Sequence, residues 1–126
     1  MSNGASGRYA YEGLDRLLHE KARLGILTCL VAHPEGLLFN DLKEMCSLTD
    51  GNLSRHLQVL RQNELVDIWK GFENRRPQTL CRLSQEGRER FLSYLSELEK
   101  VLSDVHRSPA ESGEWATPVP NGWIAT

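Results

Sequence analysis

The chain has 126 residues, of which 40% are hydrophobic and 25% are charged, and its formal net charge is −2. This length suits a single domain with its own core, and the composition is that of an ordinary globular protein. No apolar run reaches the ~20 residues that cross a bilayer, and residues 1–10 lack the apolar centre of a signal peptide. We therefore expect a cytoplasmic protein with no membrane partner.

The first part of the chain predicts one long helix. Residues 1–10 are small and polar, and we expect them to be flexible. Apolar residues then recur mostly at steps of three and four from Leu14 to Val31, which predicts an amphipathic helix. This helix is expected to end by His33, because Pro34 follows.

Two short helices are expected next, after a small strand at residues 37–39. Asn40 is the expected N-cap of a helix over residues 40–46. After a tight connection, Thr49 is the expected cap of a third helix, which runs to about Asn63.

A hairpin and a last helix complete the pattern. Residues 65–70 and 79–83 are rich in strand-forming residues and flank an eight-residue loop, which predicts a β-hairpin. Ser84 is a plausible N-cap for a helix whose apolar residues recur at threes and fours up to Val105.

This order of elements predicts a mainly α fold with a small β-hairpin, an α+β class. Two short helices joined by a tight turn and followed by a hairpin make the winged helix-turn-helix plan. The domain is expected to span residues 11–106. Residues 107–126 are rich in Pro, Ser, Gly and Thr and are expected to be a disordered tail, although Trp115 and Trp123 lie within it.

The third helix has two contrasting faces when it is stepped at 100° per residue. Leu53, Leu57 and Leu60 gather on one side with His56, which we expect to be packed. The polar side carries Gly51, Asn52, Ser54, Arg55 and Gln58. Arginine, glutamine, asparagine and serine can pair with bases or phosphates, and a glycine lets a helix N-terminus approach a phosphate.

A polar face alone is weak support for DNA contact, because most solvated helices have one. The absence of acid is more informative, since no Asp or Glu occurs from Gly51 to Asn63. The hairpin loop is also basic, with Lys70, Arg75 and Arg76 around it. The net negative chain argues mildly against a nucleic-acid partner, but residues 51–82 are net positive. We therefore predict contacts of the hairpin with the minor groove or phosphates.

These features resemble a known family. The runs are FNDLKEMC, LTDGNLSRHLQVL and KGFENRRPQT, followed by LSQEGRERF. In this order they are similar to winged-helix transcriptional regulators related to the MarR and ArsR groups, and in particular to a small MarR-like subgroup. The likeness covers roughly residues 14–95. One departure is Glu64, where the family commonly has glycine.

The resemblance implies a sequence-specific, DNA-binding dimer that acts on transcription. By this likeness, the polar residues of the third helix and Asp50 fall on the recognition helix, and Arg75 and Arg76 fall at the wing. The partners implied are double-stranded DNA and a second copy of the chain. A small-molecule effector is left open, because the sequence shows no effector pocket.

The last helix has an apolar stripe longer than so small a domain can easily cover. Part of the stripe is expected to pack on the first helix. The remainder is expected to form a homodimer through Leu95, Leu98, Val101, Leu102 and Val105. A two-fold dimer would place two recognition helices about one DNA turn, ~34 Å, apart.

Other functions find less support in the residues. The alternative that stays open is a winged helix used as a protein-interaction module without DNA binding. The chain has no nucleophile elbow, P-loop, HExxH or dinucleotide glycine motif, so we expect no enzyme. Cys29, Cys46 and Cys81 form no CxxC pair and the histidines lack ligand spacing, so we expect no metal site and no cofactor.

Overall fold

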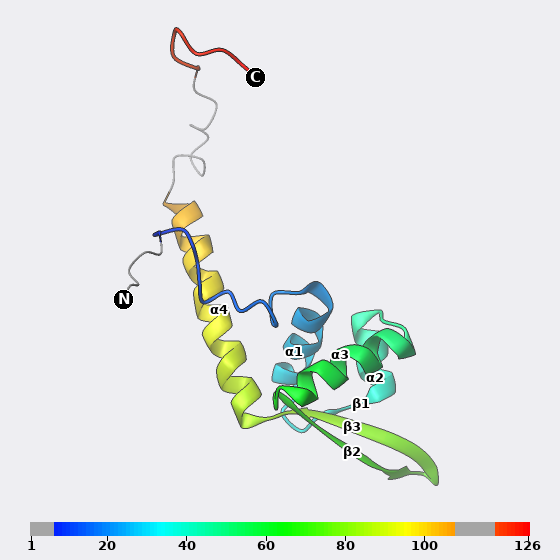
Figure 1. Cartoon of the computed structure of the whole chain (residues 1–126). Helices are drawn as coiled ribbons and strands as arrows, with labels where there is room; N and C mark the ends of the chain where they lie inside the picture. Colours follow the sequence, from blue (N-terminus) through cyan, green and yellow to red (C-terminus); the bar gives the residue numbers. More distant parts are fainter. Residues whose placement is uncertain (1–6, 108–117) are drawn as a thin grey trace.

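A computed structural model describes residues 7–107 and 118–126 of the chain. Within them the chain forms four helices and a three-stranded antiparallel sheet (Figure 1). The elements are α1 (Lys21–Ala32), β1 (Leu37–Leu38), α2 (Phe39–Cys46), α3 (Asp50–Gln62), β2 (Val66–Glu73), β3 (Arg76–Leu83) and α4 (Gln85–His106). This arrangement confirms the predicted winged helix-turn-helix with a long C-terminal helix.

Helices α1, α2 and α3 gather at the base of the hairpin, and α4 rises away from them (Figure 1). In the sheet, β3 lies between β1 and β2, with Leu37 opposite Cys81 and Val66 opposite Leu83. The β2–β3 hairpin projects from the body on the side away from α4 (Figure 1). Helix α4 and the end of the hairpin thus extend in opposite directions from one small core (Figure 1).

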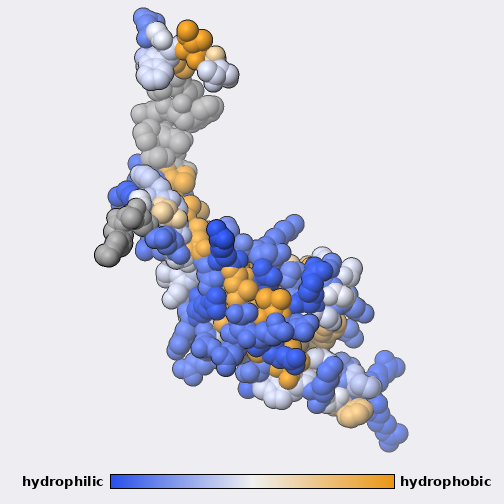
Figure 2. All heavy atoms as spheres, viewed as in Figure 1, coloured by the Kyte–Doolittle hydropathy of each residue, from blue (hydrophilic) through white to orange (hydrophobic). Residues whose placement is uncertain are grey.

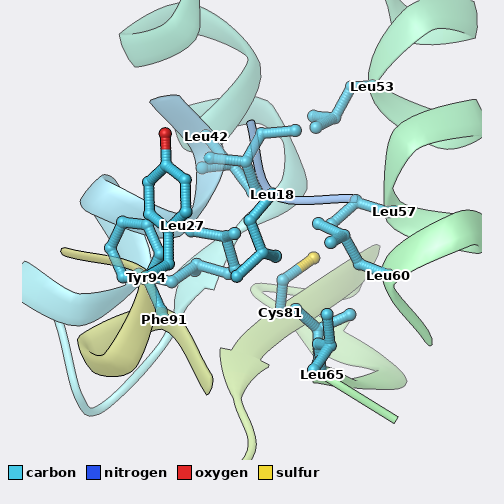
Figure 3. Packing of buried hydrophobic residues seen from close by; sticks show 13 residues of the cluster. Leu18, Leu27, Leu42, Leu53, Leu57, Leu60, Leu65, Cys81, Phe91 and Tyr94 are labelled. Atoms are coloured by element: carbon cyan, nitrogen blue, oxygen red, sulfur yellow. The ribbon is translucent and has the colours of Figure 1, made fainter. Parts of the chain in front are cut away.

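The core joins every helix to the sheet. Its fully buried members include leucines from α1, α2 and α3, together with Cys81 of β3 and two aromatic rings of α4 (Figure 3). The rings of Phe91 and Tyr94 are stacked, with their centroids 6.1 Å apart. Burial of each such side chain stabilises the fold by roughly 1.5–3 kcal/mol. The recognition-helix candidate α3 is held in place by this core.

The prediction of one helix from Leu14 was wrong at its start. Residues 11–20 form turns, and α1 begins only at Lys21. The carboxylate of Asp15 accepts a hydrogen bond from the backbone N–H of Leu17 at 2.9 Å, which favours a local turn over a helix. The carboxylate of Glu20 accepts from the N–H of Arg23 at 2.8 Å and caps the helix instead.

Although residues 11–20 form turns, their apolar side chains still lie in the core. The periodic spacing of these residues in the sequence therefore reflects packing and not a helix. Leu18 is fully buried, and Leu14 and Leu17 pack against the core. Polar contacts fasten this segment to α4. Arg90 pairs with Asp15 at 2.6 Å, and the Tyr94 hydroxyl lies 2.6 Å from Nδ1 of His19. The guanidinium of Arg90 lowers the pKa of the Asp15 carboxyl below its usual range.

Asn40 does not cap α2, which is a second correction. Pairing of Leu38 with Leu80 of β3 holds Leu38 in an extended conformation, and the helix starts at the next residue, Phe39. Leu38 is therefore the N-cap and makes no side-chain cap bond. The caps predicted at Thr49 and Ser84 are confirmed. Their hydroxyls accept hydrogen bonds from the N–H groups of Asn52 at 3.2 Å and Gly87 at 2.9 Å.

The predicted eight-residue hairpin loop was also wrong, because the strands extend through most of it. Only Asn74 and Arg75 lie between β2 and β3, and both have positive φ, at 51° and 66°. Two consecutive residues of positive φ define a type I′ turn, whose twist matches that of the flanking strands. Glu73 therefore pairs directly with Arg76, and the wing is a stiff ladder up to its end.

One junction fixes α3, β2 and α4 relative to one another. The N–H of Leu65 donates to the carbonyl of Leu60 at 2.9 Å, and the N–H of Ser84 donates to the carbonyl of Leu65 at 3.0 Å. A Cβ on Gly87 would collide with that same carbonyl oxygen of Leu65, so only glycine allows this approach. The end of the recognition-helix candidate is thereby tied to the start of the wing and the start of α4.

The residues expected to be flexible or disordered are only partly described. Residues 1–6 and 108–117, including Trp115, lie outside the described residues. Residues 118–126 are exposed and form neither helix nor strand, with Trp123 75% exposed. Within the described part of the chain, no helix is long and apolar enough to cross a membrane.

Glu64 supplies a test of backbone strain at the end of α3. Its φ is 61°, a left-handed conformation that costs a non-glycine residue about 1–2 kcal/mol. Its N–H donates to the carbonyl of Arg61 at 2.9 Å, which completes a Schellman motif with the Leu65 bond. We expect Glu64→Gly to raise the free energy of unfolding by about 1 kcal/mol, measured by urea denaturation. Glu64→Ala removes the same carboxylate but keeps the strained φ, so equal stability of the two variants would refute the backbone explanation.

Candidate nucleic-acid interface

The start of α3 is fixed by its cap and by an ion pair with α2. Besides the Thr49 cap, the ammonium of Lys43 lies 2.7 Å from the carboxylate of Asp50. Asp50 also stands in the first turn of α3, where a negative charge favours the helix dipole. Asp50 thus has a local role at the helix terminus, and its charge is partly balanced by α2.

The two predicted faces of α3 are present. His56 is 9% exposed and the leucines at 53, 57 and 60 are buried, so this stripe faces the core. Nδ1 of His56 lies 3.4 Å from the guanidinium of Arg23, which confirms a packed histidine. The five candidate residues of the other stripe are all exposed: Gly51, Asn52, Ser54, Arg55 and Gln58.

Two of these residues contact each other. The guanidinium of Arg55 donates to the side-chain oxygen of Asn52 at 3.1 Å, one helical turn earlier. This bond restrains the arginine along the helix surface and leaves other donors of its planar fork available. A Cβ on Gly51 would meet no atom within 4 Å. Packing inside the chain therefore does not require a glycine there, and the surface beside the helix N-terminus is open.

The wing carries the remaining candidates. Arg75 is the second residue of the type I′ turn and Arg76 begins β3, so two adjacent exposed cations stand at the end of the hairpin. Lys70 lies further back on β2, opposite Thr79. The hairpin surface in view is mainly hydrophilic (Figure 2).

A groove between α3 and the hairpin brings residues of both elements together. It has a volume of about 360 Å³. Its polar lining consists of Ser54, Gln58 and Arg61 from α3, with Lys70 and Thr79 from the hairpin. Apolar atoms of Phe39, Leu57 and Ile68 complete it. The groove joins the middle of α3 to the middle of the hairpin, and Gly51, Arg75 and Arg76 are not among its lining residues.

The sequence-based set of site residues omitted Arg61 and Thr79. Arg61 follows Gln58 by three residues and Ser54 by seven, so helical spacing alone could have identified it. Thr79 could not be found without the strand register that places it beside Lys70. Arg82, by contrast, belongs elsewhere, because its guanidinium lies 4.8 Å from the ring centre of Trp69, on the opposite face of the hairpin from Lys70.

The residues proposed for dimerisation fall into two groups. Leu95 and Leu98 pack against the core of their own chain. Val101 is half-buried, whereas Leu102 is 53% exposed and Val105 is 47% exposed. Apolar atoms are visible along the part of α4 that extends beyond the body (Figure 2). Residues 8–13 also contact this part of α4, where Arg8 pairs with Asp104 at 3.0 Å.

The cysteines lie in apolar surroundings. Cys81 is fully buried, and the sulfurs of Cys29 and Cys46 are 3.7 Å apart between α1 and α2. Burial and the neighbouring thiol raise the pKa of Cys46 to about 12, so this thiol stays protonated. Among residues 7–107 and 118–126, no three His, Cys, Asp or Glu side chains gather as metal ligands would.

Comparisons with known proteins agree with this geometry. Residues 22–102 match the family described as "Winged helix DNA-binding domain". An uncharacterized protein of Methanocaldococcus jannaschii, MJ0432, is 34% identical over 67 residues, which cover 53% of this chain and 73% of that protein.

Solved structures show the same fold. A transcriptional regulator homologue from Pyrococcus horikoshii is 31% identical and has a TM-score of 0.68, covering 72% of this chain and 89% of that one. A MarR-family regulator from Silicibacter pomeroyi is 19% identical with a TM-score of 0.56, covering 82% and 72% of the two chains. A MepR variant of S. aureus, bound to an oligodeoxyribonucleotide, is 21% identical with a TM-score of 0.59, covering 80% and 77%.

The matched family segment contains α3, the whole wing and most of α4, so it includes every candidate DNA-contact residue described above. The chain therefore belongs to the family of winged-helix DNA-binding domains, it is similar to a transcriptional regulator homologue, and its fold is also that of a MarR-family regulator.

Proposed function

We propose that this chain is a sequence-specific, double-stranded-DNA-binding regulator of transcription that acts as a homodimer. In the proposed complex, α3 enters the major groove, and the wing contacts the minor groove and the phosphates beside it. The observation that carries the proposal is the groove shared by α3 and the hairpin. Its polar lining is free of acidic side chains and contains Ser54, Gln58, Arg61 and Lys70.

The chemistry of the exposed α3 face supports base contacts. An arginine can donate two parallel hydrogen bonds to guanine, and glutamine or asparagine can pair with adenine in the same manner. Arg55 and Gln58 lie on the same exposed face of α3, one turn apart. Asn52 holds the Arg55 guanidinium before DNA arrives, which lowers the entropy lost on binding.

The open surface at Gly51 and the wing arginines support phosphate contacts. The N-terminus of α3 carries a partial positive charge that attracts an anion, and the missing side chain at position 51 leaves room for one. Cations at positions 70, 75 and 76 extend this attraction along the wing. The MepR variant with a similar fold was solved with bound DNA, which adds support from the fold alone.

Binding to a labelled duplex at increasing salt concentration tests the proposal as a whole. We expect affinity at ~50 mM salt that falls steeply as salt rises, because bound phosphates release counterions. Negligible binding, or binding that salt does not change, would instead favour a protein-interaction module. Selection from a random duplex pool supplies the preferred sequence for the variants below.

The first variant tests base reading by α3. We expect Arg55→Ala to lose about 1–3 kcal/mol of discrimination between the selected sequence and a duplex with altered half-sites. Competition binding with both duplexes measures this ratio. Arg16→Ala removes one exposed arginine outside the interface and serves as the matched control. An unchanged ratio in Arg55→Ala would show that this residue reads no base.

The second variant tests phosphate contact by the wing. We expect the double change Arg75→Ala with Arg76→Ala to weaken binding to every sequence and to flatten the salt slope by about 1–2. The slope of the logarithm of the binding constant against the logarithm of salt concentration is the measurement. A double change at Arg16 and Arg88, two exposed arginines elsewhere, is the control. Equal slopes in both double variants would exclude a specific wing contact.

The third variant tests the dimer. We propose that the exposed end of the α4 stripe pairs with a second copy, because Leu102 and Val105 remain exposed in a single chain. Light scattering at micromolar concentration should give about twice the 14.3 kDa mass of one chain. Leu102→Glu should give the monomer mass, because an unpaired charge would be buried in the interface. Val119→Glu in the exposed tail is the control, and a monomeric wild type would contradict the proposal.

A further inference from the structure

One aromatic residue of the wing is left without cover. Phe72 lies on β2, one residue before the last of that strand, and is 78% exposed. Figure 2 shows an apolar patch near the end of the otherwise hydrophilic hairpin. A large apolar ring in water gains free energy when a partner covers it, so a ring at the end of a projecting element indicates a contact surface.

The strand register tells which face Phe72 occupies. Alternate residues of a strand share a face, so Phe72 lies on the same face as Lys70 and Ile68. Ile68 packs against the core, and Lys70 lines the groove beside α3. The face therefore continues from the core, past the α3 groove, to the end of the wing.

A second hollow shows this continuity directly. It has a volume of about 330 Å³ and lies next to the α3 groove, with Lys70, Thr79 and Phe39 common to both. Phe72 and Pro77 line its outer part. These two residues are directly opposite each other in the β2–β3 ladder, so the rigid proline ring is the cross-strand neighbour of the aromatic ring on the same face.

The charges around Phe72 decide what kind of partner fits. Lys70 lies two residues before it on the same face, and the exposed Arg75 follows in the turn. The neighbouring carboxylate, Glu73, lies on the other face of the hairpin, where it is directly opposite Arg76. An apolar ring between cations matches a surface that is negative at its margins and apolar inside. The minor groove of DNA has this character, with phosphates along both edges and stacked bases and sugars within.

We propose that Phe72, beside Pro77, enters the minor groove and partly unstacks one base step under the wing. The inference rests on the proposed function and adds a source of specificity that the major-groove contacts of α3 do not supply. Steps that unstack easily, such as TA, would accept the ring more readily than GC steps. Phe72 would thus select sequence through the deformability of the duplex and without a hydrogen bond to any base.

Two duplexes test the insertion of Phe72 into a base step. Both carry the sequence that the wild-type protein selects except at the base step beneath the wing, and hydroxyl-radical protection locates that step. One duplex has a TA step there and the other has a GC step. We expect wild type to bind the TA duplex about 5-fold or more tightly than the GC duplex. With 2-aminopurine in place of the adenine, its fluorescence should rise on binding, because unstacking relieves quenching.

Variants test whether the Phe72 ring itself causes the preference for the TA duplex. Phe72→Ala should bind both duplexes with similar affinity and give no rise in fluorescence, whereas Phe72→Leu should retain most of the preference. Trp123→Ala removes an aromatic residue of nearly equal exposure, 75%, from the tail and should behave as wild type. Loss of the two wing arginines should lower both affinities and leave the ratio between the duplexes in place.

The outcomes distinguish this inference from the function on which it rests. Wild-type protein that binds no duplex in a salt-dependent manner contradicts the proposed function itself. If wild-type protein binds the TA and GC duplexes with equal affinity, only the insertion of Phe72 is contradicted. A TA preference and a fluorescence rise that both persist in Phe72→Ala would also overturn the assignment of this residue.

Discussion

Burial of one stripe of α3 is the constraint on which the rest of the structure depends. Leu53, Leu57 and Leu60 occupy successive turns and are fully or almost fully buried, so they fix both the position and the rotation of the helix. Once that rotation is fixed, the residues between them must face outward. The exposed stripe from Gly51 to Gln58 is thus presented by the core, and a shift of the helix by one residue would turn it away.

The same core also sets where the wing stands. The β2–β3 ladder begins with buried Val66 and ends with exposed residues, and its two-residue turn keeps the strands paired to the end. A hairpin of this kind has few ways to bend, so Lys70 and Phe72 keep their relation to α3. The proposed interface is therefore made of two elements that share one support, and the distance between them needs little adjustment when a ligand arrives.

Local chemistry explains which features the sequence could predict. Thr49 and Ser84 were identified as caps because a hydroxyl next to a helix start acts within a few residues, and the rotation of α3 followed from its periodicity. The Asn40 cap failed because the start of α2 is set by pairing of Leu38 with β3, which lies about 40 residues further along the chain. The hairpin loop failed because residues 71–78 are poor in strand formers, yet the β2–β3 register carries the pairing through them to a two-residue turn. The prediction of a helix from Leu14 was wrong because a series of turns can bury the same leucines. Hydrophobic periodicity alone does not distinguish such turns from a helix. For the same reason, Thr79 could be assigned to the groove only after the register was known.

The contact of Gly87 with the Leu65 carbonyl has a mechanical consequence. It joins the foot of α4 to the end of α3 and the start of β2, so these parts turn together. Helix α4 has 22 residues and is ~33 Å long. A small rotation about the Gly87 contact would therefore move its far end by a large distance. In the proposed dimer, the crossing angle of the two α4 helices would set the separation of the two recognition helices. A change in that angle would therefore alter the spacing of the DNA sites that the dimer accepts, with no change in the DNA-facing surface.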